Sequence, residues 1–354
     1  MNYDSLLKVA RSLIWLPLAL IGLSASADAK RTDDVVVLKN GDHLTGEIKS
    51  LEHGELTFKN DYMLDSVRLD WKWVVRLESK DRYLVTLTSG QVFTALISLR
   101  SVAVANRPDF LMQTGDASLS VRPVEVLKIL PDNRRFWKQL NGTIDLGFSY
   151  TAGDNQYQTQ FSASAAYDGQ GYEVTGDVSS SFDGQSGGGG TSYNALNSQY
   201  RRLFKQKWFF GGLADLLNSE EQSLDLRTSL GGIVGRRFIQ TSRTSLSVFT
   251  GAAGTRERYS SAAGRRVVTG AESLLGLDFS TFRFRTLDLS ARLLVWPSLT
   301  EPGRLRMGFN SSLRVELRKN LFWNLSLYDN FDRQPPVNAR KNDLGISNSF
   351  GWKF

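Results

Sequence analysis

The sequence has 354 residues, of which 41% are hydrophobic and 22% charged, and it contains no cysteine. Without cysteine the chain can form neither a disulfide framework nor the lipid anchor of a lipoprotein. The formal net charge of +7 is compatible with nucleic acid or an anionic surface as partner. The length leaves room for two domains.

The first residues predict export. Arg11 precedes the apolar run Leu13–Leu23, and small residues follow, with cleavage expected after Ala27 or Ala29. This order is typical of a secretory signal peptide, to which we assign residues 1–29. The apolar run is too short for a membrane-spanning helix and no longer one follows, which excludes a helical membrane protein. Because an exported chain rarely meets nucleic acid, we exclude that partner.

Residues 30–133 contain an internal repeat. In each copy two alternating strands flank a glycine turn, and the two glycines, Gly41 and Gly90, are 49 residues apart (90 minus 41). A further alternating strand closes each copy. The copies comprise Val35–Ile48 with residues 67–77, and Tyr83–Ile97 with residues 119–129. Repeats of roughly fifty residues with short strands have the size of SH3-like or Sm-like barrels. We therefore predict two such modules in tandem.

Residues 136–354 consist of longer segments in which apolar and polar residues alternate. Such alternation over segments of about ten residues or more is typical of a transmembrane β-barrel. We expect about twelve strands, an even number that suits a closed antiparallel barrel. They lie near residues 138–151, 156–168, 172–183, 193–204, 207–218, 222–237, 244–257, 266–280, 282–296, 304–318, 320–332 and 342–354. The predicted fold is therefore all-β.

The last strand carries a possible assembly signal. Apolar side chains occupy one face of the segment, and they end in Phe350, Trp352 and Phe354, the terminal residue. This pattern resembles the closing strand of bacterial outer-membrane barrels, whose assembly machinery reads that end. We expect the machinery as a partner, together with outer-membrane lipid and lipopolysaccharide.

The residue types argue against catalysis. The only histidines, His43 and His53, precede the barrel, whereas barrel hydrolases normally need a histidine as general base. No cysteine or tight cluster of acidic residues accompanies these histidines. We therefore predict no enzyme, no catalytic residue, no metal and no cofactor.

Charged residues on the polar face of the barrel strands form the main candidate site. By strand parity, acidic residues enter the lumen from early strands and arginines mostly from later ones. The candidates for solute selection are Asp145, Glu173, Asp177, Arg227, Arg292, Arg306 and Arg314. Opposed charged walls orient solutes in water-filled pores, which predicts a diffusion channel with a mild preference for anions. The alternative is an occluded lumen in which these charges form salt bridges.

A second candidate site lies in the N-terminal modules. Trp71, Lys72 and Trp73 supply aromatic and basic surface on one closing strand, where we expect the two tryptophans to share a face. Small β-barrels bind peptides or glycans through such grooves, so peptidoglycan, a periplasmic protein or the mouth of the barrel are the partners considered. In the alternative interpretation both tryptophans pack in the core.

The segment Leu38–Ile48, followed by Gly54–Phe58 and Leu69–Trp71, closely resembles the N-terminal module of the YdiY-like, salt-induced outer-membrane proteins, a family of unknown function. The resemblance covers nearly the whole mature chain. It implies residence in the outer membrane and says little about activity. We expect the N-terminal domain in the periplasm and the channel to be used in envelope or osmotic adaptation. It assigns no site residues. The alternative to a channel is a non-conducting structural or docking protein.

Overall fold

The computed structural model describes most of the chain after residue 33. The described residues are 34–98, 102–104, 107–115, 117–132, 140–151, 156–169, 171–185, 190–204, 207–261, 264–283, 287–318, 320–335 and 339–353. The predicted signal peptide and Phe354 lie outside them. Within the described residues, no helix has both the length and the apolar character needed to cross a membrane.

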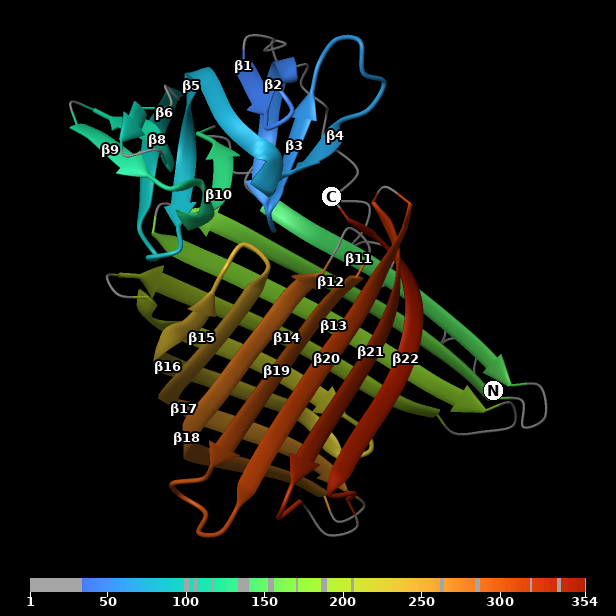
Figure 1. The fold of residues 1–354 in the computed structure, drawn as a ribbon. Coiled ribbons are helices and arrows are strands. Elements are labelled where there is room, and N and C mark those ends of the chain that lie inside the picture. Colours follow the sequence, from blue (N-terminus) through green and yellow to red (C-terminus); the bar gives the residue numbers. More distant parts are fainter. Residues whose placement is uncertain are drawn as a thin grey trace.

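The N-terminal domain is built from short antiparallel strands and two single-turn 3-10 helices (Figure 1). The elements are β1 (Asp34–Leu38), β2 (His43–Glu52), β3 (Glu55–Lys59), β4 (Val67–Asp70), η1 (Trp71–Trp73), β5 (Val74–Leu87), β6 (Val92–Ser98), β7 (Val102–Val104), β8 (Arg107–Thr114), β9 (Ala117–Val121), η2 (Pro123–Glu125) and β10 (Val126–Pro131). The strands belong to one sheet with the order β4-β3-β2-β1-β5-β6-β8-β7, to which β9 and β10 are added.

The two sequence repeats share strands and a single core. The long strand β5 pairs with β1 of the first repeat and with β6 of the second, and β10 of the second repeat pairs with both β5 and β2. Side chains from both repeats, such as Ile48 and Ile129, are at most 1% exposed in the same apolar cluster. The modules are therefore fused into one domain.

Both predicted closing strands are interrupted by a 3-10 turn. Asp70 caps η1, because its Oδ1 accepts a hydrogen bond of 3.2 Å from the backbone N–H of Lys72. Pro123 opens η2. The two turns meet where Trp71 Nε1 donates to the carbonyl of Pro123 at 2.8 Å. The prediction that Trp71 and Trp73 share a strand face is therefore wrong, since Trp71 is 6% and Trp73 50% exposed.

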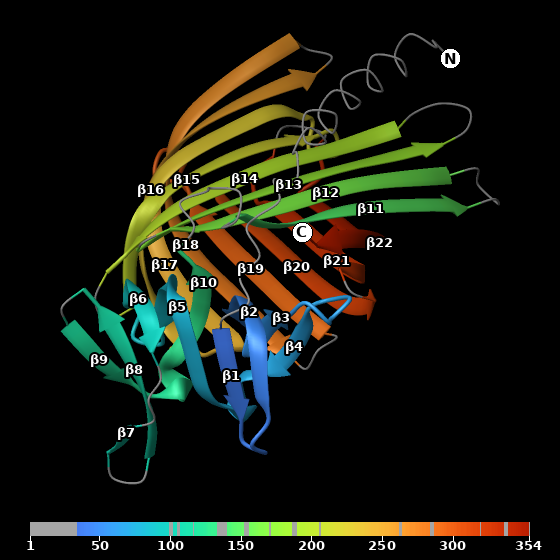
Figure 2. The same ribbon diagram turned by 90° about the horizontal axis from the view of Figure 1, so that it is seen from above.

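The prediction of a closed twelve-stranded antiparallel barrel is confirmed (Figure 1). Its strands are β11 (Leu140–Thr151), β12 (Gln156–Gly169), β13 (Tyr172–Gln185), β14 (Gly190–Leu203), β15 (Trp208–Ser219), β16 (Leu224–Gln240), β17 (Thr244–Ser261), β18 (Gly264–Arg283), β19 (Leu287–Pro297), β20 (Leu305–Arg318), β21 (Leu321–Asp332) and β22 (Asn342–Lys353). The first and last strands lie side by side (Figure 2) and pair from Thr143↔Lys353 to Leu146↔Phe350.

Alternation places apolar side chains outside and polar side chains inside the barrel. Leu146 is 64% exposed, whereas its neighbour Asp145 is 1% exposed. Outward side chains from strands all round the barrel are between 53% and 71% exposed, among them Leu146, Phe148, Phe210, Leu230, Leu275 and Ile346. A soluble protein rarely exposes so much contiguous apolar surface. Such a surface is suited to contact with lipid.

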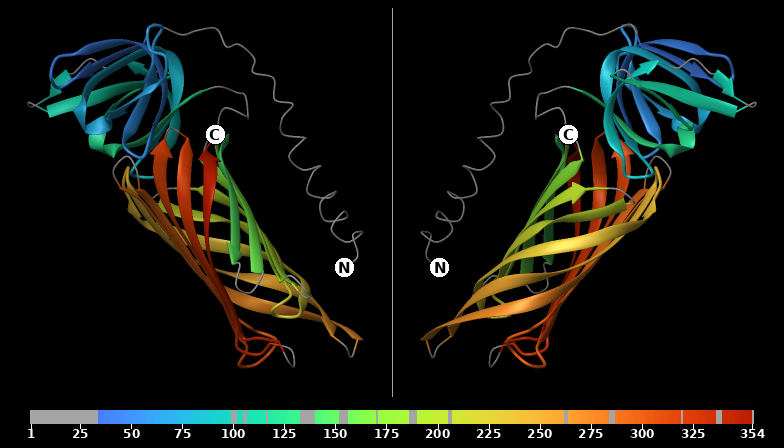
Figure 3. Two further views of the ribbon diagram at one scale, coloured as in Figure 1. Left: turned by 90° about the vertical axis from the view of Figure 1, so that its right-hand side faces the viewer. Right: turned by 90° about the vertical axis from the view of Figure 1, so that its left-hand side faces the viewer.

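The N-terminal domain rests on the end of the barrel where the C-terminus lies (Figure 3). Lys128 forms ion pairs with Glu52 of its own domain, at 2.7 Å, and with Asp168 at the end of β12. The ring of His53 stacks on Phe282 with 3.5 Å between ring centroids. These contacts join the N-terminal domain to the rim of the barrel.

Two further ion pairs extend this junction. The guanidinium of Arg68 binds both carboxylate oxygens of Glu316 on β20, at 2.8 and 2.9 Å. Asp70 lies 3.5 Å from Arg243, in the turn between β16 and β17. The junction therefore joins the N-terminal domain to strands or turns at several places around the rim.

Candidate functional site

A network of buried ion pairs occupies the lumen near the end remote from the N-terminal domain. Arg304 binds Glu257 at 2.8 Å and Asp332 at 2.7 Å. Arg227 binds the same Glu257 at 2.5 Å. The side chains of these four residues are between 2% and 8% exposed. Because the residues come from β16, β17, β21 and the segment before β20, the network ties non-adjacent strands together.

Ion pairs also cross the middle of the lumen. Asp278 on β18 receives Arg292 from β19, at 2.7 Å, and Arg201 from β14. Since β14 and β18 are not neighbours in the barrel, the bond from Arg201 bridges the interior. Six residues along β18 (278 minus 272), towards the end remote from the N-terminal domain, Glu272 makes a bidentate pair with Arg306. A paired guanidinium is held in place and its charge is largely neutralised.

Ion pairs between arginines and carboxylates also occupy the part of the lumen nearer the N-terminal domain. Arg237 on β16 pairs with Glu173 on β13, and Arg314 on β20 lies 3.9 Å from Asp145 on β11. Early-strand carboxylates thus do face later-strand arginines, as the sequence suggested. They meet as ion pairs rather than as two separated walls.

One sector of the lumen is apolar. Phe209, Leu213, Ile233, Phe249 and Leu274 form an inward cluster on β15 to β18, each at most 8% exposed. This packing fills part of the cross-section, in keeping with the small interior of barrels of this size.

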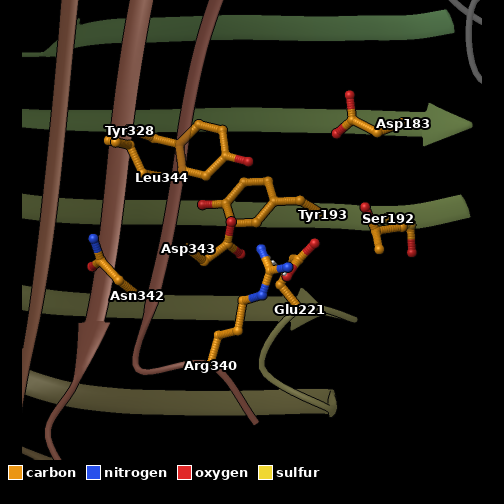
Figure 4. Close-up of a pocket in the computed structure, with 10 residues that line it drawn as sticks. Asp183, Ser192, Tyr193, Glu221, Tyr328, Arg340, Asn342, Asp343 and Leu344 are labelled. Atoms are coloured by element: carbon orange, nitrogen blue, oxygen red, sulfur yellow. Dashed lines mark ion pairs between the residues drawn. The ribbon is translucent and has the colours of Figure 1, made fainter. Parts of the chain in front are cut away.

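A pair of stacked tyrosines reaches across the lumen. The rings of Tyr193 on β14 and Tyr328 on β21 lie 4.5 Å apart, inclined by 15° (Figure 4). Asn330 Nδ2 donates to the hydroxyl of Tyr193 at 3.3 Å, and Ser219 donates to Asp343 at 2.6 Å. These contacts join β14 and β15 to β21 and β22 across the lumen.

Two small cavities adjoin Tyr193. The outer cavity, of about 100 Å³, is lined by polar groups that include Asp183, Glu221, Arg340 and Asp343 (Figure 4). The inner cavity, of about 70 Å³, contains Asp215 and Asn310. Tyr193 lines both cavities. Each volume admits several water molecules but no sugar-sized solute.

The predicted lumen residues all point into the barrel. Most of the described lumen arginines are ion-paired, whereas Asp177 lies in no ion pair of the described residues. A role of these residues in selecting solutes stays a prediction. Sequence reasoning missed Tyr193, Tyr328 and Glu257. Their inward parity could have been read from the alternation, but their partners lie on strands far apart in sequence.

The other candidate residues divide into buried and exposed groups. Trp71 belongs to the core and cannot face a partner, which corrects its inclusion in the binding surface. Trp73 and Lys72 remain on the surface, with Lys39 Nζ 5.9 Å from the centre of the Trp73 ring. In the proposed assembly signal, Phe350 and Trp352 are 58% and 54% exposed on the outside of β22.

The fold has distant counterparts among solved structures. The NanC porin aligns with 60% of this chain and 98% of its own, with 11% identity and a TM-score of 0.39. The translocator domain of the autotransporter NalP from Neisseria meningitidis aligns with 61% of this chain and 86% of its own, with 15% identity and a TM-score of 0.33. No curated protein matches the sequence.

A family model gives the stronger result. Residues 144–354 match the family described as "Protein of unknown function, DUF481". The matched segment coincides with nearly the whole barrel, from β11 to the last residue, and comprises more than half of the chain. The match agrees with the resemblance found in the sequence. The chain is therefore a member of the DUF481 family.

Proposed function

We propose that this protein is an outer-membrane β-barrel with a narrow, gated passage for small hydrophilic solutes. The exposed apolar side chains outside the barrel would contact lipid, and the polar lumen would contain water. The N-terminal domain would lie in the periplasm, because outer-membrane barrels keep short turns on that side. The connections next to the domain, such as Thr241–Arg243, are short, while that from Ser298 to Arg304 at the other end is longer.

The arrangement around Tyr193 and Tyr328 carries the proposal. Two cavities lie in the same lumen and Tyr193 lines both, so the stacked rings would act as the partition between them. The outer cavity is lined mainly by polar groups, and the inner one by polar and apolar groups. Rotation of one ring out of the stack would join the cavities without breaking a backbone hydrogen bond. A lumen built only for rigidity would not need two neighbouring cavities that each hold several water molecules.

Conductance of the purified protein in a planar bilayer tests the proposal. We expect small, intermittent openings for the natural sequence and larger, longer openings for the Tyr193→Ala/Tyr328→Ala variant. Tyr200→Ala is the matched control, since Tyr200 lies on the same β14 strand but is 43% exposed. A folded double variant that does not conduct would refute the gated passage.

A non-conducting docking protein is the second candidate. Two observations favour it, namely the ion pairs that cross-link the lumen and the junction through which Lys128 and Arg68 hold the N-terminal domain. In this case the domain would present Lys72 and Trp73 to peptidoglycan or a periplasmic protein. Lipopolysaccharide and the assembly machinery are proposed partners in either case. Neither proposal includes an enzymatic step.

A further inference from the structure

One row of cross-strand neighbours on the lumen wall consists of oxygen-bearing side chains. The strand register aligns, from β11 to β16, the residues Thr143, Ser164, Asp177, Asn197, Asp215 and Ser229. All point inward: Thr143 and Ser229 are 6% and 2% exposed inside the barrel, and the hydroxyls of Thr143 and Ser164 are hydrogen-bonded at 2.7 Å. From β11 to β16 the row contains no basic residue; beyond Thr143 it ends at Lys353 on β22.

The row runs along the passage as well as around it. Thr143 is three residues from the rim end of β11 (143 minus 140), whereas Ser229 is five residues from the opposite end of β16 (229 minus 224). Strands spaced about 4.8 Å apart and tilted by about 40° make such a row rise by roughly 15 Å over its five steps. The oxygens therefore form a track from near the periplasmic rim towards the tyrosine pair.

The outer part of the track lies beside an empty space. Asn197, Asp215 and Ser229 line the cavity of about 70 Å³ that lies inside the tyrosine pair. Within the described part of the chain, Oδ2 of Asp215 is buried and has no hydrogen-bond partner. A buried carboxylate oxygen without a partner is costly unless a bound species or water satisfies it.

The arginines of the lumen do not neutralise the two carboxylates of the track. The charges that reach Asp215 come from Arg292 and Arg306, but these guanidinium groups bind Asp278 and Glu272. Among the described residues, neither Asp177 nor Asp215 has a basic side chain within ion-pairing distance. The unpaired fixed charge along this wall is therefore negative.

We propose that this track makes the passage selective for small hydrated cations, with Asp177 and Asp215 as the residues that determine the selectivity. The inference rests on the proposed function and names its solute class. Hydroxyl, amide and carboxylate oxygens are the ligands of hard cations, and acidic side chains in a pore favour cations over anions. The anion preference expected from the arginines is not retained, because the lumen arginines that were its basis are paired.

The sign of the reversal potential in a potassium chloride gradient tests the proposal. For an ideally selective passage a tenfold gradient corresponds to about 59 mV. We expect the Tyr193→Ala/Tyr328→Ala background, which keeps the passage open, to show a potential of the cation-selective sign. Adding Asp177→Asn and Asp215→Asn should remove at least about half of it. Asp42→Asn, which removes a carboxylate in the exposed turn between β1 and β2 of the N-terminal domain, should change it little.

The outcomes separate the two proposals. A conducting protein with an anion-selective potential, or an equal effect of Asp42→Asn and the double substitution, would overturn the track and leave the channel intact. Absence of conductance would overturn the channel. In that event, binding of terbium as a probe cation tests the track without conductance. Trp296 lines the same cavity and would sensitise the luminescence of terbium bound there. Terbium emission that persists unchanged in Asp177→Asn/Asp215→Asn, or is absent from the natural sequence, would refute it.

Discussion

Replacing Lys128 by methionine should release the N-terminal domain from the barrel. Lys128 is the shared cation of Glu52 and Asp168, with 20% of its side chain exposed. Its removal leaves two carboxylates facing each other. Breaking a buried pair in this way costs about 3–5 kcal/mol, and the residual exposure places the effect near 3 kcal/mol. This is roughly a hundredfold change in the docking equilibrium.

A single introduced thiol can report this release. The chain has no cysteine, so Ser242→Cys supplies a unique thiol in the turn between β16 and β17. A side chain at Gly54 of the docked domain would lie 3.4 Å from Ser242 Oγ, so docking should shield the thiol. When the domain redocks faster than the reagent reacts, the labelling rate follows the undocked fraction. We therefore expect labelling by a maleimide to accelerate roughly a hundredfold in Lys128→Met.

Two variants control the experiment. Lys72→Met removes an exposed pair with Asp70, which is worth at most about 1 kcal/mol, and should hardly change the labelling rate. Asp168→Asn changes only the barrel side of the junction and should again accelerate labelling, since Lys128 loses one of its two partners. If labelling in Lys128→Met is as slow as in the parent, then the domain is not held by this cation and our account of the junction is wrong.

Further predictions concern the membrane face, the N-terminal core, assembly and pH. Leu325→Arg, on the outward face of β21, should destabilise the barrel in a lipid-vesicle folding assay by about 2–4 kcal/mol, whereas inward Ser326→Arg should be mild; equal effects would contradict the assigned faces. Trp71→Ala should destabilise the N-terminal domain by about 3–5 kcal/mol in urea titration and Trp73→Ala by much less; similar losses would contradict their different burial. Deletion of Phe354 should lower the amount of heat-modifiable barrel in the outer membrane, and normal amounts would count against the assembly signal. Desolvation against Phe282, with the charges of Lys353 and Lys128, outweighs the opposing effect of Glu52 and lowers the pKa of His53 to about 4. Because the undocked ring binds its proton at a higher pH, docking should weaken as the pH falls from about 6.5 towards that value. Since only the thiolate reacts, the labelling rate of the Ser242→Cys variant is divided by that of a free thiol at the same pH; this ratio should rise as the pH falls, and a constant ratio would exclude His53 as the cause.

The barrel could be predicted because its signal is local. Each strand alternates with a period of two, and the side on which Leu325 or Ser326 lies follows from the parity of its position alone. The predicted ends of the strands differ from the observed ends. The eighth strand was expected over residues 266–280 and extends over Gly264–Arg283, since hydrogen bonding to its neighbours continues beyond the clear alternation.

The prediction of continuous closing strands in the N-terminal domain was wrong, and the sequence contains the residues that interrupt them. Pro123 cannot donate to a strand ladder, so its position inside the predicted strand 119–129 indicates an interruption. Asp70 is a residue type that favours helix caps. Both features are visible in the sequence, but alternation of large apolar residues concealed the short turns between them.

The contacts inside the lumen could not be predicted in the same way. Tyr193 and Tyr328 are 135 residues apart (328 minus 193) and meet only because the closed barrel brings β14 opposite β21. The same is true of Asp215, whose position beside Asn197 and Ser229 depends on the register of three strands. Parity indicates that a charge enters the lumen, but only the tilt and closure of the barrel decide whether it meets a partner. Most lumen arginines are paired with carboxylates, whereas Asp215 is paired with no basic side chain among the described residues. This difference changes the proposed solute from an anion to a cation.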